Sequence, residues 1–238
     1  MVQIEEDTRS LTIVVTHTVY FGLMTVLALA GNLLVFLALY RNRRLRNITN
    51  LYVLSLAVAD VTVATFLFPF KAIASGLRRW PFGYNFAQFV GCIQLLWIGA
   101  SVCTLILTAL NRYFCVVKPQ RYSIYFMYGY GSVYRVILRH NNAVAPSLQG
   151  ANSSGAARAQ EIKSCRVLFA TVFGFCTTWF PWICFLMLEH GFNISIPSVA
   201  LSIAMLSTSI SAWINPVIYG VMNQAMRKEF QNILLCRN

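Results

Sequence analysis

The amino-acid sequence predicts an all-α integral membrane protein that folds as a single domain over residues 1–238. Composition is the first observation behind this prediction. Of all residues, 58% are hydrophobic and only 11% are charged, whereas soluble domains carry about 25% charged residues. The second observation is that the apolar residues gather in five runs. Each run exceeds the roughly 20 residues that a helix needs to cross a hydrocarbon core about 30 Å thick. The runs are residues 11–40, 51–76, 84–117, 164–188 and 196–222.

A weaker apolar segment lies between the third and fourth runs. Residues 122–138 are aromatic and apolar, but at a rise of about 1.5 Å per residue they are near the lower limit for crossing. We therefore expect a partial span there. Residues 143–159 are rich in Ala, Ser, Asn and Gly, a composition that is typical of a flexible loop.

The segment that follows the last run, residues 223–236, is predicted to be an amphipathic helix at the inner membrane surface. Its apolar side chains share one face and its polar side chains the other. Cys236 at its end is a candidate for palmitoylation. The alternative is a frayed tail with an incidental cysteine. The apolar set is Met226, Phe230, Ile233 and Leu234, and the polar set is Arg227, Lys228 and Gln231.

The placement of basic residues predicts the topology. If the N-terminus is outside, 15 of the 19 Lys and Arg residues fall in segments on the cytosolic side. The positive-inside rule therefore predicts a multi-pass protein of the cell membrane with an extracellular N-terminus and a cytosolic C-terminus. The acidic N-terminus lacks a basic stretch, so we expect no cleaved signal peptide.

Charge placement, cysteine spacing and the lack of catalytic motifs exclude several other classes of function. A net charge of +12 that is distributed by topology indicates attraction to anionic membrane lipids rather than nucleic-acid binding. The seven cysteines show neither metal-ligand spacing nor a disulfide framework. The sequence contains no nucleophile–base pair and no phosphate-binding loop, so we do not expect an enzyme.

Polar residues recur inside the apolar runs, and Asp60 is the most costly of them. An ionised Asp near the bilayer centre costs about 2.5–3.5 kcal/mol on insertion scales and persists only with partners. We expect the side chains of Asn32, Asp60, Ser101 and Asn215 to meet. One interpretation is a structural polar knot. The other is a cation site, because oxygens grouped around a carboxylate suit a hard ion.

Together these residues resemble the rhodopsin-like (class A) G protein-coupled receptors. The motifs occur in the family's order and cover nearly the whole chain. They are Gly31-Asn32, Leu56-Ala57-Val58-Ala59-Asp60, Asn111-Arg112-Tyr113, Cys176-Thr177-Thr178-Trp179-Phe180-Pro181 and Asn215-Pro216-Val217-Ile218-Tyr219. The resemblance implies a bundle of the seven-helix receptor type.

The resemblance also implies roles for single residues. The set Asn32, Asp60, Ser101 and Asn215 would form a polar core that binds a sodium ion. Arg112, flanked by Asn111 and Tyr113, would engage the G protein, and Glu161 falls where relatives hold its acidic partner. The residues expected to change position on activation are Asn111, Arg112, Tyr113, Tyr130, Glu161, Phe175, Trp179, Pro181, Pro216 and Tyr219.

Within the class, several motifs look like those of melatonin receptors. The resemblance places a ligand pocket at Gln94, Trp179 and Ser209. Gln94 stands where amine receptors carry an ammonium-binding Asp, and Ser209 stands where opsins carry the retinal-binding Lys. Amines and retinal are therefore not the expected ligands.

The chain departs from the family in the middle. The family crosses the membrane seven times, and this sequence predicts five full spans and a partial one. The fourth helix, the second extracellular loop and the outer half of the fifth helix do not appear. The cysteine expected at the outer end of the third span is Ala87, so both halves of the family's disulfide are absent.

The predicted function is that of a receptor that transmits binding of an unidentified extracellular ligand to a cytosolic heterotrimeric G protein. The alternative is a shortened, non-signalling membrane protein that forms oligomers with full-length receptors. A transporter would need inverted repeats or a polar path, and the sequence shows neither.

Overall fold

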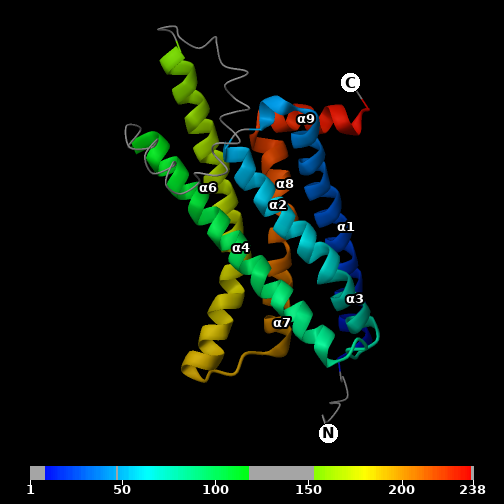
Figure 1. Ribbon diagram of the computed structural model, residues 1–238. Helices are drawn as coiled ribbons and strands as arrows, with labels where there is room; N and C mark the ends of the chain where they lie inside the picture. Colours follow the sequence, from blue (N-terminus) through cyan, green and yellow to red (C-terminus); the bar gives the residue numbers. More distant parts are fainter. Residues whose placement is uncertain (1–8, 47, 118–152, 237–238) are drawn as a thin grey trace.

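The computed structural model describes residues 9–46, 48–117 and 153–236, and every regular element in these ranges is helical. The long helices run side by side, and one short helix lies across an end of the bundle (Figure 1). The elements are α1 (Leu11–Arg41), η1 (Arg43–Leu45), α2 (Ile48–Phe66), α3 (Phe68–Gly76), α4 (Tyr84–Val117), α6 (Ser153–Leu186), η2 (Met187–Gly191), α7 (Ser198–Ser209), α8 (Ser211–Met222) and α9 (Gln224–Leu234).

Within the described residues, four stretches of helix are each long and apolar enough to cross a membrane, and the bent pair α7 and α8 makes a fifth if it is counted as one span. The prediction of an all-α membrane bundle is therefore confirmed, and its five full spans agree with the higher of these two counts. Residues 122–138, where we predicted a partial span, lie outside the described residues, and so does the first part of the predicted loop.

Two of the predicted spans are not single straight helices. The span at 51–76 consists of α2 and α3, which meet at Leu67, because Pro69 in the first turn of α3 cannot donate a backbone hydrogen bond to the preceding helix. The last span bends by 44° between α7 and α8. Pro216 lies inside α8 and leaves the carbonyl of Ala212 without its helical N–H partner.

The predicted loop at 143–159 is wrong over its second part, because α6 begins at Ser153. The sequence from Ala156 to Glu161 contains Ala, Arg, Gln and Glu, which are strong helix formers. The loop prediction, which rested on overall composition, gave too little weight to the helix propensity of these residues. At its other end α6 stops at Leu186, two residues before the predicted end, and a π-helical turn continues to Gly191.

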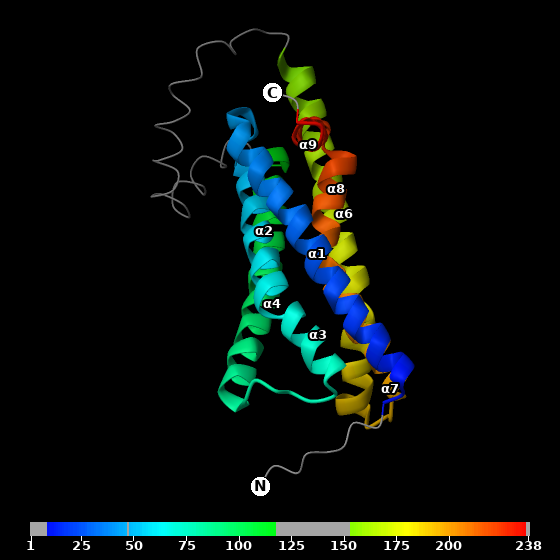
Figure 2. The same ribbon diagram turned by 90° about the vertical axis from the view of Figure 1, so that its right-hand side faces the viewer.

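Helix α1 is central to the packing, since it contacts α2, α3, α8 and α9. Its buried residues recur at helical spacing on one face, as expected for a helix with one side against the bundle. Gly31 allows close approach to α8, because a Cβ at that position would lie 3.0 Å from Cγ of Pro216. Turning the bundle by 90° shows α1 running diagonally over its neighbours (Figure 2).

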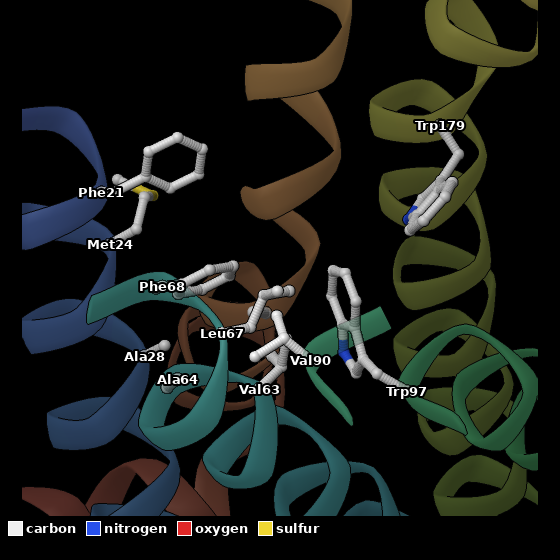
Figure 3. Packing of buried hydrophobic residues seen from close by; sticks show 11 residues of the cluster. Phe21, Met24, Ala28, Val63, Ala64, Leu67, Phe68, Val90, Trp97 and Trp179 are labelled. Carbon is white, nitrogen blue, oxygen red and sulfur yellow. The ribbon is translucent and has the colours of Figure 1, made fainter. Parts of the chain in front are cut away.

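Two apolar clusters fill the bundle. The first joins α1, α2, α3, α4, α6 and α8, and Figure 3 shows its side chains converging, with Trp97 and Trp179 facing each other. The second lies at the end of the bundle that carries α9. The first consists of Phe21, Met24, Ala28, Val63, Ala64, Leu67, Phe68, Val90, Trp97, Trp179 and Ala212, and the second of Val35, Ala38, Leu39, Leu45, Ala57, Tyr219, Met226 and Phe230.

Candidate functional site

A carboxylate lies at the centre of the bundle. Asp60 on α2 is 1% exposed. Its Oδ1 accepts a hydrogen bond from Nε1 of Trp97 on α4 at 3.0 Å, and its Oδ2 accepts one from Nδ2 of Asn215 on α8 at 3.1 Å. Three helices are thus joined through one side chain. Hydrogen bonds to a carboxylate are stronger than those between neutral groups, and burial away from bulk solvent strengthens them further.

Of the four side chains predicted to meet, Asp60 and Asn215 are in contact, whereas the amide of Asn32 donates to backbone carbonyls. The amide of Asn215 is oriented by a second acceptor, because its Nδ2 also lies 3.1 Å from the carbonyl oxygen of Ser211. Ser101 is buried as well, at 3% exposure. It lies four residues after Trp97 and so on the same face of α4.

Asn32 lies in the same region, but its side chain binds backbone carbonyl groups. Its Nδ2 donates to the carbonyl oxygens of Ala28 at 2.9 Å and Ala212 at 2.8 Å. The Ala212 carbonyl is the one that Pro216 leaves without a helical partner, and a bare carbonyl in hydrocarbon would be costly. Asn32 thus compensates for the proline. Its own Oδ1 is buried and has no hydrogen-bond partner.

The donor set around Asp60 does not fit a sodium ion. A hard cation takes on the order of six oxygen ligands, but the two groups that face the carboxylate are N–H donors with their positive ends toward it. Among the described residues only Asn32 offers a buried side-chain oxygen without a partner in this region. The sodium ion stays a prediction of the sequence that this arrangement does not favour.

Trp179 on α6 lies beside this centre. Its ring stacks on Phe175 at 5.6 Å between centroids and meets the ring of Trp97 at 5.6 Å. Its Nε1 donates to Oγ of Ser211 at 3.3 Å. Phe175 and Trp179, both expected to change position on activation, are thus in contact, and Pro181 lies two residues beyond Trp179 on α6. The indole of Trp179 is 6% exposed.

A cavity of about 480 Å³ opens at the α9 end of the bundle. Tyr219, which is 4% exposed, and Thr171 line it together with basic side chains from two elements, Arg44 and Arg166. None of the three residues predicted to form the ligand pocket lines this cavity. Its walls come from η1, α2, α4, α6, α8 and α9.

The predicted ligand residues lie elsewhere. Oε1 of Gln94 on α4 accepts a hydrogen bond from Nζ of Lys71 on α3 at 3.3 Å, and that ammonium lies 5.7 Å from the ring centre of Phe21. Ser209 is buried against α1, where its Oγ lies 3.0 Å from the hydroxyl of Tyr20. Gln94 and Ser209 thus have separate partners.

Sequence reasoning missed Lys71 and Trp97. Each carried a signal, since a charge inside a span calls for a partner and so does a buried indole N–H. The rotation of α4 decides that Trp97 faces Asp60, and the sequence alone does not give this rotation.

Other predicted residues are described only in part. Asn111 and Arg112 lie on α4 and Glu161 lies on α6, but their side chains lie outside the described set, as does the whole of Tyr130. Tyr113 is 46% exposed.

The amphipathic helix α9 packs on the bundle. Met226 and Phe230 are buried, and Nδ2 of Asn42 at the end of α1 donates to Oε2 of Glu229 at 3.2 Å. Oε1 of Glu229 lies 3.8 Å from Nε of Arg41. Glu229 is 8% exposed, so this contact fixes α9 to α1.

The last residues of α9 extend past the packed part of the helix surface. Leu234, which we placed on the apolar face of this helix, is its last residue and is 71% exposed. Cys236 follows the helix and is an exposed free thiol.

The fold and the site around Asp60 together define a multi-pass helical membrane protein with a carboxyl group buried between its helices. Residues 31–128 match the sequence profile of a family described as the 7 transmembrane receptor (rhodopsin family). This part of the chain is thus similar to the rhodopsin family of seven-transmembrane receptors.

Curated relatives agree with this family. The chain is 36% identical over 110 residues to the histamine H2 receptor of Homo sapiens, a match that covers 46% of this chain and 31% of the relative. It is 36% identical over 97 residues to neuropeptide FF receptor 2 of Mus musculus, covering 41% and 23%. It is 39% identical over 101 residues to the allatostatin-A receptor of Bombyx mori, covering 42% and 28%. The chain thus spans about a third or less of these relatives. The likeness to melatonin receptors stays a prediction.

Proposed function

We propose that this chain is a G protein-coupled receptor, which binds an extracellular ligand and activates a cytosolic heterotrimeric G protein through the α9 end of the bundle. The observation that carries the proposal is the buried centre in which Asp60 joins α2, α4 and α8. A charged side chain in hydrocarbon costs about 2.5–3.5 kcal/mol on insertion scales, and a simple anchor would be more stable without it. The comparisons do not support the alternative of a non-signalling partner of full-length receptors.

The mechanism is a shift between two arrangements of the helices. A ligand that binds one arrangement more tightly raises its population. Trp179 contacts both Phe175 and Trp97, so a movement of α6 alters the surroundings of Asp60. At the other end Tyr219 lines the cavity beside α9, which is where we expect the G protein to bind.

The proposed orientation follows from charge. The α9 end carries basic side chains such as Arg44, Arg166, Arg227 and Lys228, which suit the anionic cytosolic leaflet. This charge distribution supports an extracellular N-terminus. Palmitoylation of the exposed Cys236 would add a lipid anchor at the same surface.

The structure favours a ligand without a protonated amine near Gln94. The only described side-chain partner of its Oε1 is the ammonium of Lys71, at 3.3 Å. A ligand ammonium placed there would meet a like charge, which is unfavourable in a site of low dielectric. Histamine, which names one of the relatives, is such a cation. We expect histamine to give no response at concentrations that saturate the histamine H2 receptor in parallel cells.

The proposed function is tested by nucleotide exchange. Membranes with increasing amounts of the full chain are mixed with purified Gs, Gi or Gq heterotrimers, and GTP analogue uptake is measured. We expect uptake to rise with the amount of chain for at least one heterotrimer and to fall about tenfold for Arg112→Ala. Equal uptake with and without the chain for all three heterotrimers would contradict the proposal.

A further inference from the structure

The indole of Trp97 occupies an unusual place for a large aromatic side chain. It is 4% exposed, and its N–H points at the buried carboxylate of Asp60. Figure 3 shows the ring of Trp97 between Val63 and Leu67 on one side and Trp179 on the other. Its centroid lies 6.3 Å from that of Phe68 and 5.6 Å from that of Trp179. The ring is therefore held on more than one side.

The two N–H donors that face the carboxylate of Asp60 cannot be replaced by oxygen ligands through rotation of their side chains. An indole has a donor and no acceptor. The amide of Asn215 presents its nitrogen to both Asp60 and the carbonyl of Ser211, so turning it would set oxygen against two oxygens. Oγ of Ser211 is also engaged, since it donates to the carbonyl of Thr208 at 2.7 Å.

We propose that Trp97 is a positioning residue that takes the place of a cation at Asp60. Its N–H balances the carboxylate, and its ring fills the volume beside it, so the centre works without sodium. A cation at Asp60 would have to displace the indole and leave a buried N–H unpaired, which costs about 1–3 kcal/mol. The inference concerns only this ion requirement, and it can fail while the proposed receptor function stands.

The test is thermal unfolding of the purified full chain in detergent. Each sample is measured in sodium chloride and in N-methyl-D-glucamine chloride at equal ionic strength, so that only specific sodium binding separates the two curves. For the wild type we expect the same unfolding midpoint in both salts, and likewise for Asp60→Asn. A wild-type midpoint that rises with sodium and loses this rise in Asp60→Asn would overturn the proposal.

Two variants at Trp97 separate its N–H from its volume. Trp97→Asn removes the ring and supplies an oxygen beside Asp60, so we expect its midpoint to rise by about 3 °C or more with sodium. The rise should vanish when Asp60→Asn is added. Trp97→Phe keeps most of the ring and loses the donor, so its midpoint should fall equally in both salts.

Each outcome at Trp97 bears on the proposal. A folded Trp97→Asn protein without sodium dependence would overturn the claim that the indole excludes the ion. If Trp97→Asn does not fold, the comparison between the wild type and Asp60→Asn decides the question alone. G protein exchange does not enter any of these measurements.

Discussion

Replacement of Gly31 by Ala tests the close packing of α1 against α8. The new Cβ would lie 3.0 Å from Cγ and 3.1 Å from Cβ of Pro216. Carbon atoms in good contact are about 3.5–4.0 Å apart, so the helices must separate or the proline must shift. Overpacking of this kind costs about 1–3 kcal/mol. Since Asn32 and Asn215 flank this contact along α1 and α8, separation would also stretch the hydrogen bonds of the centre.

Gly22→Ala in the same helix is the matched control, because no atom lies within 4 Å of its added Cβ. Ala is favoured over Gly in a helix by up to about 1 kcal/mol, so Gly22→Ala should be neutral or stabilising. The assay is the apparent unfolding midpoint in detergent at one scan rate, followed by size-exclusion chromatography. We expect Gly31→Ala to unfold about 3–10 °C below Gly22→Ala. Equal midpoints would refute the close packing of Gly31 on Pro216.

Two further predictions concern the partners of single groups. In a double-mutant cycle, Asn32→Ala should cost about 1–3 kcal/mol, because the Ala212 carbonyl loses its donor. It should cost less in a Pro216→Ala background, where the restored backbone N–H can serve that carbonyl, and equal costs in both backgrounds would contradict this account. Glu229→Gln should weaken the attachment of α9, since it removes the charge that faces Arg41 at 3.8 Å. Hydrogen exchange of α9 measures this, with Glu189→Gln as a control in another helix, and unchanged protection of α9 would show that the Glu229 charge does not hold it.

The spans and the polar centre could be predicted from the sequence to different degrees. Length and apolar composition are enough for the spans, because every backbone group in hydrocarbon must be paired within a helix. The contact between Asp60 and Asn215 was also predictable, since a buried charge needs partners and few polar side chains were available inside the spans. The helix at 153–159 was missed because a loop composition was preferred over helix propensity.

What the sequence determined by itself is a membrane protein with several helices and an internal polar group, because hydrophobicity and the cost of burying charge act on each residue wherever its neighbours lie. Beyond the contact between Asp60 and Asn215, only the tertiary structure decided which atoms meet. The rotation of α4 turns Trp97 toward Asp60, and the packing of α1 on α8 brings Nδ2 of Asn32 to the Ala212 carbonyl. Such contacts depend on the relative rotation and tilt of helices, which packing between distant segments sets.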